Sequence, residues 1–135
     1  MATNTFHCSV ITPERAVLEA DATFVAFPAH DGEVGILKNH APLLYKLGVG
    51  VLRVETPGEK HAFFVDGGFA QMVENRLTLL TQHARPVAEI DRAVADRARE
   101  EARALPAAKG DAEIAERQRV QQRARVLDRI ARGNR

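Results

Sequence analysis

Residues 50–69 have the sequence GVLRVETPGEKHAFFVDGGF, in which strand signals and turn signals alternate. Two segments rich in β-branched and aromatic residues, 50–55 and 60–65, flank Pro57-Gly58, a dipeptide that is typical of tight turns. Asp66-Gly67-Gly68 then ends the second segment, and Phe69 begins a third. This stretch predicts a β-hairpin followed by a sharp turn into another strand.

The same alternation extends over the first 88 residues. Turn signals recur about every ten residues, a spacing that is typical of an all-β sandwich or barrel. All of the aromatic residues lie in this part of the chain, which also favours strands. We expect strands at 6–11, 22–28, 33–37, 43–46, 50–55, 60–65, 69–73 and 77–81.

From residue 89 onward, alanine and charged residues predominate, as they do in helices. Asp91 is the expected N-cap of a first helix, which Pro106 ends, and Asp111 is the expected N-cap of a second helix. The apolar positions of this αα-hairpin are mostly alanine, so burial stabilises it weakly and we expect a mobile element. The predicted domains are a β-sandwich at 1–88 and a two-helix domain at 89–135.

The overall composition excludes several classes of protein. The 135 residues are 45% hydrophobic and carry a net charge of +1, which argues against disorder and against nucleic-acid binding. Cys8 is the single cysteine, so no internal disulfide is expected, and the lack of a cysteine framework suits a reducing compartment. No apolar segment approaches the roughly 20 residues of a membrane-spanning helix, so any membrane contact is expected to run through a partner.

The residues that carry chemistry do not form the pattern of an enzyme. Cys8 and Ser9 lie in a predicted strand, and Arg53 occupies the place of the third glycine of a phosphate-binding loop that would begin at Gly48. The five histidines lack the spacing of a metal site: His7, His30, His40, His61 and His83. We therefore expect a non-catalytic protein without a metal or cofactor.

The predicted second helix carries six arginines, at positions 117, 119, 123, 125, 129 and 132. Arg125, Arg129 and Arg132 follow one another at spacings of four and three, which places them on one line of the helix. Such a helix is either a solvated surface or a docking surface for an acidic partner. The tail lacks aromatic residues that could stack on bases, which argues against nucleic acid as that partner.

Residues 32–44, with the sequence GEVGILKNHAPLL, resemble the signature loop GxxGILPGHAPLL of the epsilon subunit family of bacterial F-type ATP synthases. Two further features of the family follow in the same order along the chain. One is the segment FFVDGGF at 63–69, and the other is Ile90-Asp91 at the start of the helical tail. The length of the chain and the order of strands before hairpin also agree with this family.

The resemblance implies a sandwich of about ten strands followed by an α-helical hairpin, in a non-catalytic subunit of the rotor stalk. In the family this subunit binds the gamma subunit and the ring of c subunits, and couples proton-driven rotation of the ring to ATP synthesis. Glu33 and His40 fall in the loop that faces the c ring.

For the tail, the resemblance implies inhibition of ATP hydrolysis through contacts with the alpha and beta subunits when the tail is extended. Arg123, Arg125 and Arg129 are the candidate contacts to the beta subunit. The implied location is peripheral, at the cytoplasmic face of the bacterial inner membrane, with membrane contact only through the complex.

The sequence departs from the family pattern at two places. Lys38-Asn39 stands where the loop has Pro-Gly; Asn accepts the left-handed backbone of the missing glycine, whereas the fixed φ of proline is lost. Val94 replaces the arginine of a motif through which some members bind regulatory ATP, so we expect no tight ATP complex. The alternative to a rotor subunit is a free-standing β-sandwich binding module whose helical tail dimerises.

Overall fold

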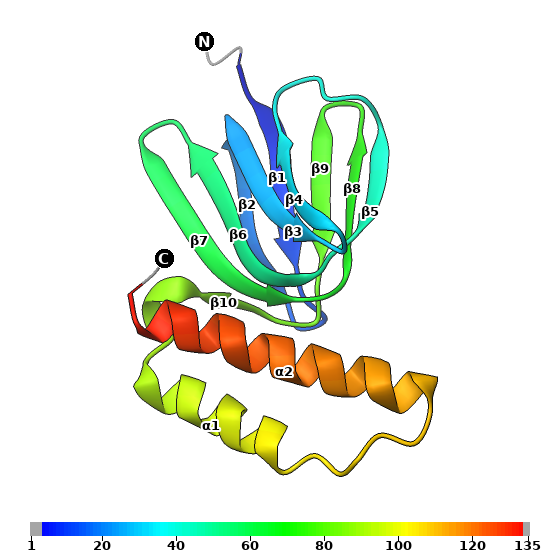
Figure 1. Ribbon diagram of the computed structural model, residues 1–135. Helices are drawn as coiled ribbons and strands as arrows, with labels where there is room; N and C mark the ends of the chain where they lie inside the picture. The colour runs from blue at the N-terminus through cyan, green and yellow to red at the C-terminus, as the bar shows by residue number, and fades with distance from the viewer. Residues whose placement is uncertain (1–3, 134–135) are drawn as a thin grey trace. The chain divides into compact units, whose positions relative to one another are not determined.

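The computed structural model describes residues 4–133 of the chain (Figure 1). The chain divides between Pro86 and Val87 into two compact units. Strands make up the first unit, and a short 3-10 helix, η1 (Val87–Glu89), and two α-helices make up the second. The predicted order of a β-sandwich before a helical hairpin is confirmed.

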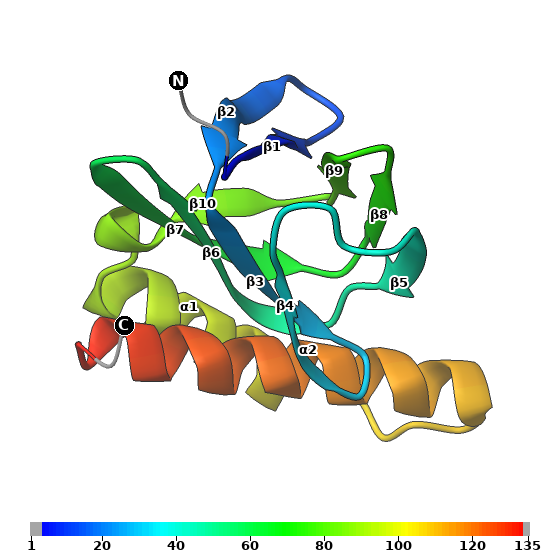
Figure 2. The ribbon, with the colours of Figure 1, turned by 90° about the horizontal axis from the view of Figure 1, so that it is seen from above.

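Ten strands form two five-stranded sheets. Their bounds are β1 (Phe6–Ile11), β2 (Ala16–Ala22), β3 (Phe24–Ala29), β4 (Gly32–Ile36), β5 (Leu43–Lys46), β6 (Val49–Thr56), β7 (Glu59–Asp66), β8 (Phe69–Val73), β9 (Arg76–Leu80) and β10 (Ala84–Pro86). Sheet A has the order β2-β1-β9-β8-β5, and sheet B has the order β10-β7-β6-β3-β4. Figure 2 shows the two sheets as facing layers, with β4 and β5 at the same side of the sandwich.

The two sheets enclose a hydrophobic core because alternate residues of each strand point inward. Each buried leucine, isoleucine or phenylalanine of such a core contributes about 1.5–3 kcal/mol relative to leaving it exposed. Sheet A contributes Phe6, Cys8, Val10, Ala70, Met72, Leu77 and Leu79, and sheet B contributes Val25, Phe27, Ile36, Leu52, Val54, Phe63 and Val65. The core therefore lies entirely within the first unit.

The strand β1 joins sheet A in an unusual way. It pairs in parallel with β9, with His7 opposite Arg76 and Val10 opposite Leu79, and antiparallel with β2. The other strand pairs of the described chain are antiparallel. The first strand of the chain therefore lies inside sheet A, next to a strand that is about 70 residues later in the sequence.

The predicted turn at Asp66-Gly67-Gly68 carries the chain from β7 in sheet B to β8 in sheet A. Gly67 and Gly68 adopt φ angles of 79° and 115°, in the region that favours glycine. Both are held by backbone hydrogen bonds, because the Leu47 amide donates to the Gly68 carbonyl at 2.8 Å and the Gly67 amide donates to the Gly48 carbonyl at 3.1 Å.

Two strands were not expected from the local pattern. β2 carries two acidic residues among alanines, and β10 has only three residues, one of which is Pro86. Both are edge strands, which need only one hydrogen-bonded neighbour and tolerate charged residues and proline. The residue pattern alone therefore found eight strands, whereas the ten implied by the family resemblance are confirmed. The strand predicted at 22–28 is β3, which begins at Phe24.

In the second unit, α1 (Arg92–Arg103) and α2 (Asp111–Ala131) run side by side as a hairpin (Figure 1). The predicted N-cap Asp91 is confirmed, since its carboxylate accepts a hydrogen bond from the Val94 amide at 3.1 Å. The predicted N-cap Asp111 is wrong. Gly110 is the cap, with extended backbone, and its carbonyl accepts the first helical bond from Ile114 at 2.9 Å. Asp111 is instead in the first turn, where the helix dipole stabilises an acidic side chain.

Candidate functional site

Residues 37–42 form a loop that connects β4 at the edge of sheet B with β5 at the edge of sheet A (Figure 2). The His40 amide donates to the Leu37 carbonyl at 3.2 Å, and Asn39 has a φ of 60°. A turn with positive φ only at its third residue is a type II turn, which glycine or asparagine accepts at that position. The expectation that Asn39 supplies the left-handed backbone of the family's glycine is confirmed.

Two leucines at the ends of this loop are unusually exposed. The exposed fraction is 62% for Leu37 and 70% for Leu44. Leucine side chains exposed to this degree on both sides of one loop indicate a contact surface, since they gain free energy when a partner covers them.

His40 lies at the tip of the loop and is exposed. Its Nδ1 atom lies 2.8 Å from the carbonyl oxygen of Ala41. Because a carbonyl can only accept, Nδ1 carries the proton of this hydrogen bond, and Nε2 remains available to a partner. Among the described residues, Nε2 of this exposed imidazole has no hydrogen-bond partner.

Glu33 lies at the beginning of β4, one residue after the turn from β3, and not at the loop end of the strand. Its Oε1 atom accepts from the Arg53 guanidinium of β6 at 3.1 Å, and both side chains are about half exposed. Leu37 follows Glu33 by four positions along an extended chain, a distance of about 13 Å. The structure therefore does not bring Glu33 and His40 together, although both belong to the stretch that resembles the signature loop.

One residue that contacts the loop lies between the strands predicted at 69–73 and 77–81. The Asn75 side chain, in the turn between β8 and β9, accepts a hydrogen bond from the Asn39 amide at 2.8 Å through Oδ1. Its Nδ2 atom donates to the Thr5 carbonyl at 3.0 Å. The pattern of turn residues at 74–75 signals the turn, but it carries no signal for these contacts.

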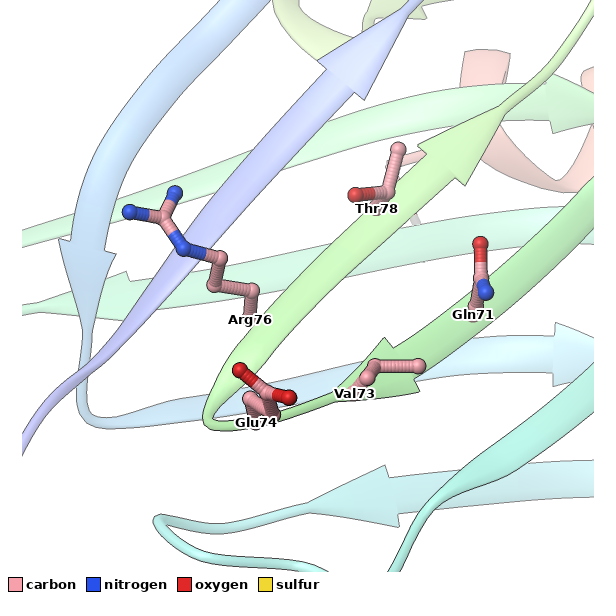
Figure 3. A pocket seen from close by; sticks show the side chains of 5 residues that line it. All are labelled: Gln71, Val73, Glu74, Arg76 and Thr78. Atoms are coloured by element: carbon pink, nitrogen blue, oxygen red, sulfur yellow. The ribbon is translucent and has the colours of Figure 1, made fainter.

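The outward face of sheet A continues the exposed apolar surface beside Leu44. Phe69 and Leu80 lie opposite each other on β8 and β9 and are 52% and 49% exposed, and Val73 is 40% exposed. A shallow hollow on the same face is lined by Gln71, Val73, Glu74, Arg76 and Thr78 (Figure 3). This mixture of apolar and polar groups on a flat sheet is typical of a protein-protein contact surface.

The three predicted arginines of the tail differ in their surroundings. Arg123 donates to Glu101 of α1 at 3.1 Å, and Arg125 donates to Gln122 of its own helix at 3.0 Å. Arg129 is exposed and makes no side-chain hydrogen bond or ion pair within residues 4–133. Of the three, Arg129 is therefore the guanidinium most available to an acidic partner in this hairpin.

Asp128 joins the two helices through a cluster of ion pairs, called here the Asp128 cluster. It accepts hydrogen bonds from Arg92 and Arg99 of α1, the latter at 3.1 Å, and pairs with Arg132, the C-cap residue of α2, at 2.9 Å. Donation from Arg92 lowers the pKa of the Asp128 carboxyl, and the same bond raises the pKa of the Arg92 guanidinium. The buried residues of α1, Ala95 and Ala98, are small and contribute little apolar area. The Asp128 cluster therefore adds electrostatic contacts between the two helices.

The described residues contain no group of three or more histidine, cysteine, aspartate or glutamate side chains that could hold a metal ion. Burial raises the pKa of the Cys8 thiol to about 12, so the thiol is protonated at neutral pH and is a poor nucleophile. The Ser9 hydroxyl donates to Glu19 at 3.3 Å rather than to a histidine. Within residues 4–133, no helix combines the length and the apolar character needed to cross a membrane.

Comparisons with known proteins agree with this architecture. The family model described as ATP synthase, Delta/Epsilon chain, beta-sandwich domain matches residues 5–87. The ATP synthase epsilon chain of Rhodopirellula baltica is 43% identical over 99 residues, which cover 73% of this chain and 77% of that protein. The ATP synthase epsilon chain of a Synechococcus species is 40% identical over 123 residues, which cover 90% of each chain.

Two solved structures have the same fold. A chain in the mitochondrial ATP synthase of Euglena gracilis, a structure of OSCP, F1 and c-ring, has a TM-score of 0.77 and 24% identity, covering 92% of this chain and 79% of that one. A chain in the central stalk and c-ring structure of the Tetrahymena thermophila enzyme has a TM-score of 0.74 and 15% identity, covering 93% and 95%. From the sequence matches, the chain belongs to the ATP synthase delta/epsilon chain family, and its curated relatives are epsilon chains.

Proposed function

We propose that this chain is a non-catalytic subunit of the rotor stalk of an F-type ATP synthase, in which it couples c-ring rotation to ATP synthesis. The observation that carries the proposal is the match of the whole sandwich, residues 5–87, to the delta/epsilon family. The solved structures of the same fold are ATP synthase assemblies, one of OSCP, F1 and the c-ring and the other of the central stalk and c-ring, which supports the same role.

In this proposal the β4–β5 loop contacts the c ring. The exposed Leu37 and Leu44 provide apolar contact area, and His40 offers Nε2 to a polar group of the ring. Glu33 contributes at the margin of this contact, because its carboxylate is paired with Arg53 and lies at the other end of β4.

The gamma subunit is the proposed partner of the outward face of sheet A. Phe69 and Leu80 form an exposed apolar pair there, next to the hollow of Figure 3, which Val73 lines together with polar residues. An extended stalk subunit can cover such a flat surface, and burial of its apolar area favours association.

For the tail we propose inhibition of ATP hydrolysis through acidic loops of the beta subunit, with alpha-subunit contacts, when the hairpin opens. Arg129 is the proposed initial contact because it is unpaired within the described hairpin. Arg123 would have to leave Glu101, and Arg125 would have to leave Gln122, before either could bind the beta subunit. Replacement of Arg129 by alanine is expected to relieve inhibition, with Arg125→Ala as the matched variant of smaller effect. Equal ATPase activity of the complexes with wild-type chain and Arg129→Ala would remove Arg129 from the proposal.

Regulatory ATP is not proposed as a tight ligand. Val94 replaces the arginine of the resembling motif, and the Asp91 carboxylate caps α1 by accepting from the Val94 amide. We expect calorimetric titration of the full chain with submillimolar ATP to give no heat of specific binding. A clear saturable isotherm would contradict this expectation.

The proposed location is the cytoplasmic face of the bacterial inner membrane, where the subunit is held peripherally by the complex. Neither nucleic acid nor lipid is a proposed partner, because the chain has a net charge of only +1 and the tail lacks aromatic residues.

The test of the main proposal is co-purification with the cognate gamma subunit, followed by ATPase assays of the catalytic head. A chain ending at Ala88 retains all residues of the hydrophobic core and serves as the comparison. Binding by both chains and inhibition only by the full chain is the expected result. A stable homodimer that does not bind the gamma subunit would instead favour the free-standing binding module.

A further inference from the structure

Asn75 connects three segments that lie far apart in the sequence. Its backbone carbonyl accepts from the His7 amide at 3.1 Å, and its Nδ2 atom donates to the Thr5 carbonyl at 3.0 Å. Its Oδ1 atom accepts from the Asn39 amide at 2.8 Å. The start of β1, the β8–β9 turn and the β4–β5 loop lie at the same end of the sandwich (Figure 1), and the hydrogen bonds of Asn75 join them.

The backbone of the β8–β9 turn holds Asn75 in place. Glu74 and Asn75 have φ angles of 49° and 62°, and Val73 pairs with Arg76 on either side of them. Positive φ at both residues of a two-residue hairpin loop is the pattern of a type I′ turn, which fits the right-handed twist of the flanking strands. The position of Asn75 is thus set by strand pairing on both sides of the turn.

The loop has few other restraints. Within the described chain, the hydrogen bond from the Asn39 amide to Asn75 is the one that joins residues 37–42 to another element. The other hydrogen bonds of the loop, His40 to Leu37 and His40 to Ala41, are internal to it. Lys38 also lacks the fixed φ that proline supplies in the family's loop.

We propose that Asn75 is a positioning residue for the β4–β5 loop. By fixing the Asn39 amide it sets the orientation of the turn from Leu37 to His40, and so presents Leu37 and the His40 Nε2 atom to the partner. The inference rests on the proposed function in one respect, namely that the partner of this loop is the c ring.

Two substitutions of Asn75 distinguish the effect of its side-chain hydrogen bonds from the effect of its backbone conformation. Asn75→Gly keeps the positive φ without strain but removes both side-chain hydrogen bonds. Asn75→Asp keeps an acceptor for the Asn39 amide and loses only the donor to Thr5. Glu74→Gly is the matched control, because Glu74 has the same sign of φ and its side chain makes no hydrogen bond within the described chain.

Amide hydrogen exchange of the full-length chain, resolved by NMR, tests the positioning itself. We expect the Asn39 amide to exchange about five- to tenfold faster in Asn75→Gly, as loss of one typical hydrogen bond predicts. Asn75→Asp and Glu74→Gly are expected to exchange like wild type. An unchanged exchange rate of the Asn39 amide in Asn75→Gly would overturn the proposal.

The number of protons pumped per ATP hydrolysed, measured with the reassembled ATP synthase in vesicles, tests the consequence. Asn75→Gly should lower this ratio, and Asn75→Asp should restore it. Faster Asn39 exchange with an unchanged ratio would overturn the assigned consequence for the rotor. Failure of the wild-type chain to restore coupling to a complex depleted of this subunit would overturn the proposed function, whereas the exchange result does not depend on it.

Discussion

Gly67 and Gly68 carry the chain between the two sheets, and they differ in what a side chain would contact. A Cβ atom on Gly68 would lie 1.9 Å from the Leu80 carbonyl oxygen, whereas a Cβ on Gly67 would meet nothing within 4 Å. Both residues have positive φ. An alanine at position 67 would therefore suffer only the strain of its positive φ, whereas an alanine at position 68 would also overlap with the backbone of Leu80.

We expect Gly68→Ala to lower the free energy of unfolding of the sandwich by about 3 kcal/mol or more, because overlap and strain add. Gly67→Ala should lower it by about 1–2 kcal/mol from strain alone. Urea titration followed by Tyr45 fluorescence measures both values, since Tyr45 lies in β5 with its ring 6.1 Å from that of Phe27. Similar losses for the two variants would contradict the structural difference between the sites.

Lys38 occupies the second position of the type II turn, where φ near −60° is required and proline is favoured. Its amide makes no backbone hydrogen bond within the described turns and loops. Lys38→Pro is therefore expected to raise the free energy of unfolding by about 0.4–1 kcal/mol, by restricting the unfolded chain. The same urea titration measures this change, and a loss of stability would show that the turn has another geometry.

At the scale of elements, the two helices depend on charge as well as on apolar packing. The Asp128 cluster links α2 to Arg92 and Arg99 of α1. Because the pKa of Asp128 is lower in the folded chain than its ordinary value of 3.8, its contribution to stability is complete above that value. The contribution is lost as the pH falls through the folded pKa, so the hairpin is expected to loosen only in acid.

Asp128→Asn is expected to speed amide hydrogen exchange in α1 at neutral pH, because it removes the charge that joins the helices. Glu116→Gln is the control, since Glu116 also has a lowered pKa but pairs with Arg119 of its own helix. Below the folded pKa of Asp128, wild type and Asp128→Asn should exchange α1 amides at the same rate. A difference between them that persists in strong acid would show that charge is not the cause.

The sequence predicts elements best where the signal is local. The strands β6 and β7 and the Asp91 cap follow from alternation and capping residues next to them. The edge strand β2 could not be predicted in this way because its pairing with β1 outweighs its weak intrinsic preference.

The features of the candidate site likewise differ in how far the local sequence predicts them. The exposed loop and the positive φ of Asn39 follow from the residues of the loop itself. The contacts of Asn75 join residues 36 and 70 positions apart, so no local pattern could indicate them. Whether Glu33, His40 and the tail arginines act as proposed stays a prediction.

At the scale of the whole molecule, Cys8 reports on the integrity of the sandwich. It is fully buried in β1, between β2 and β9, and burial raises the pKa of its thiol to about 12. A thiol reagent at pH 8 should therefore label it only during global opening, about a thousandfold or more slower than in the unfolded chain. Rapid labelling of the native chain would contradict the structure of sheet A.

A chain ending at Ala88 extends this measurement to the independence of the two units. Because the hydrophobic core lies within residues 6–79, we expect the shortened chain to protect Cys8 as well as the full chain does. Labelling of the shortened chain at the rate of the unfolded one would show that the sandwich requires the tail.

The parallel pairing of β1 with β9 also has a consequence for synthesis on the ribosome. The hairpin of β1 and β2 emerges early, but an isolated two-stranded hairpin is only marginally stable in water. At about 5–20 residues per second, several seconds pass before β9 follows. Until then Phe6 and Val10 lack the neighbouring strand of sheet A beside which they lie in the folded chain. The topology therefore predicts that the hairpin of β1 and β2 stays only marginally structured on the ribosome until β9 has been made.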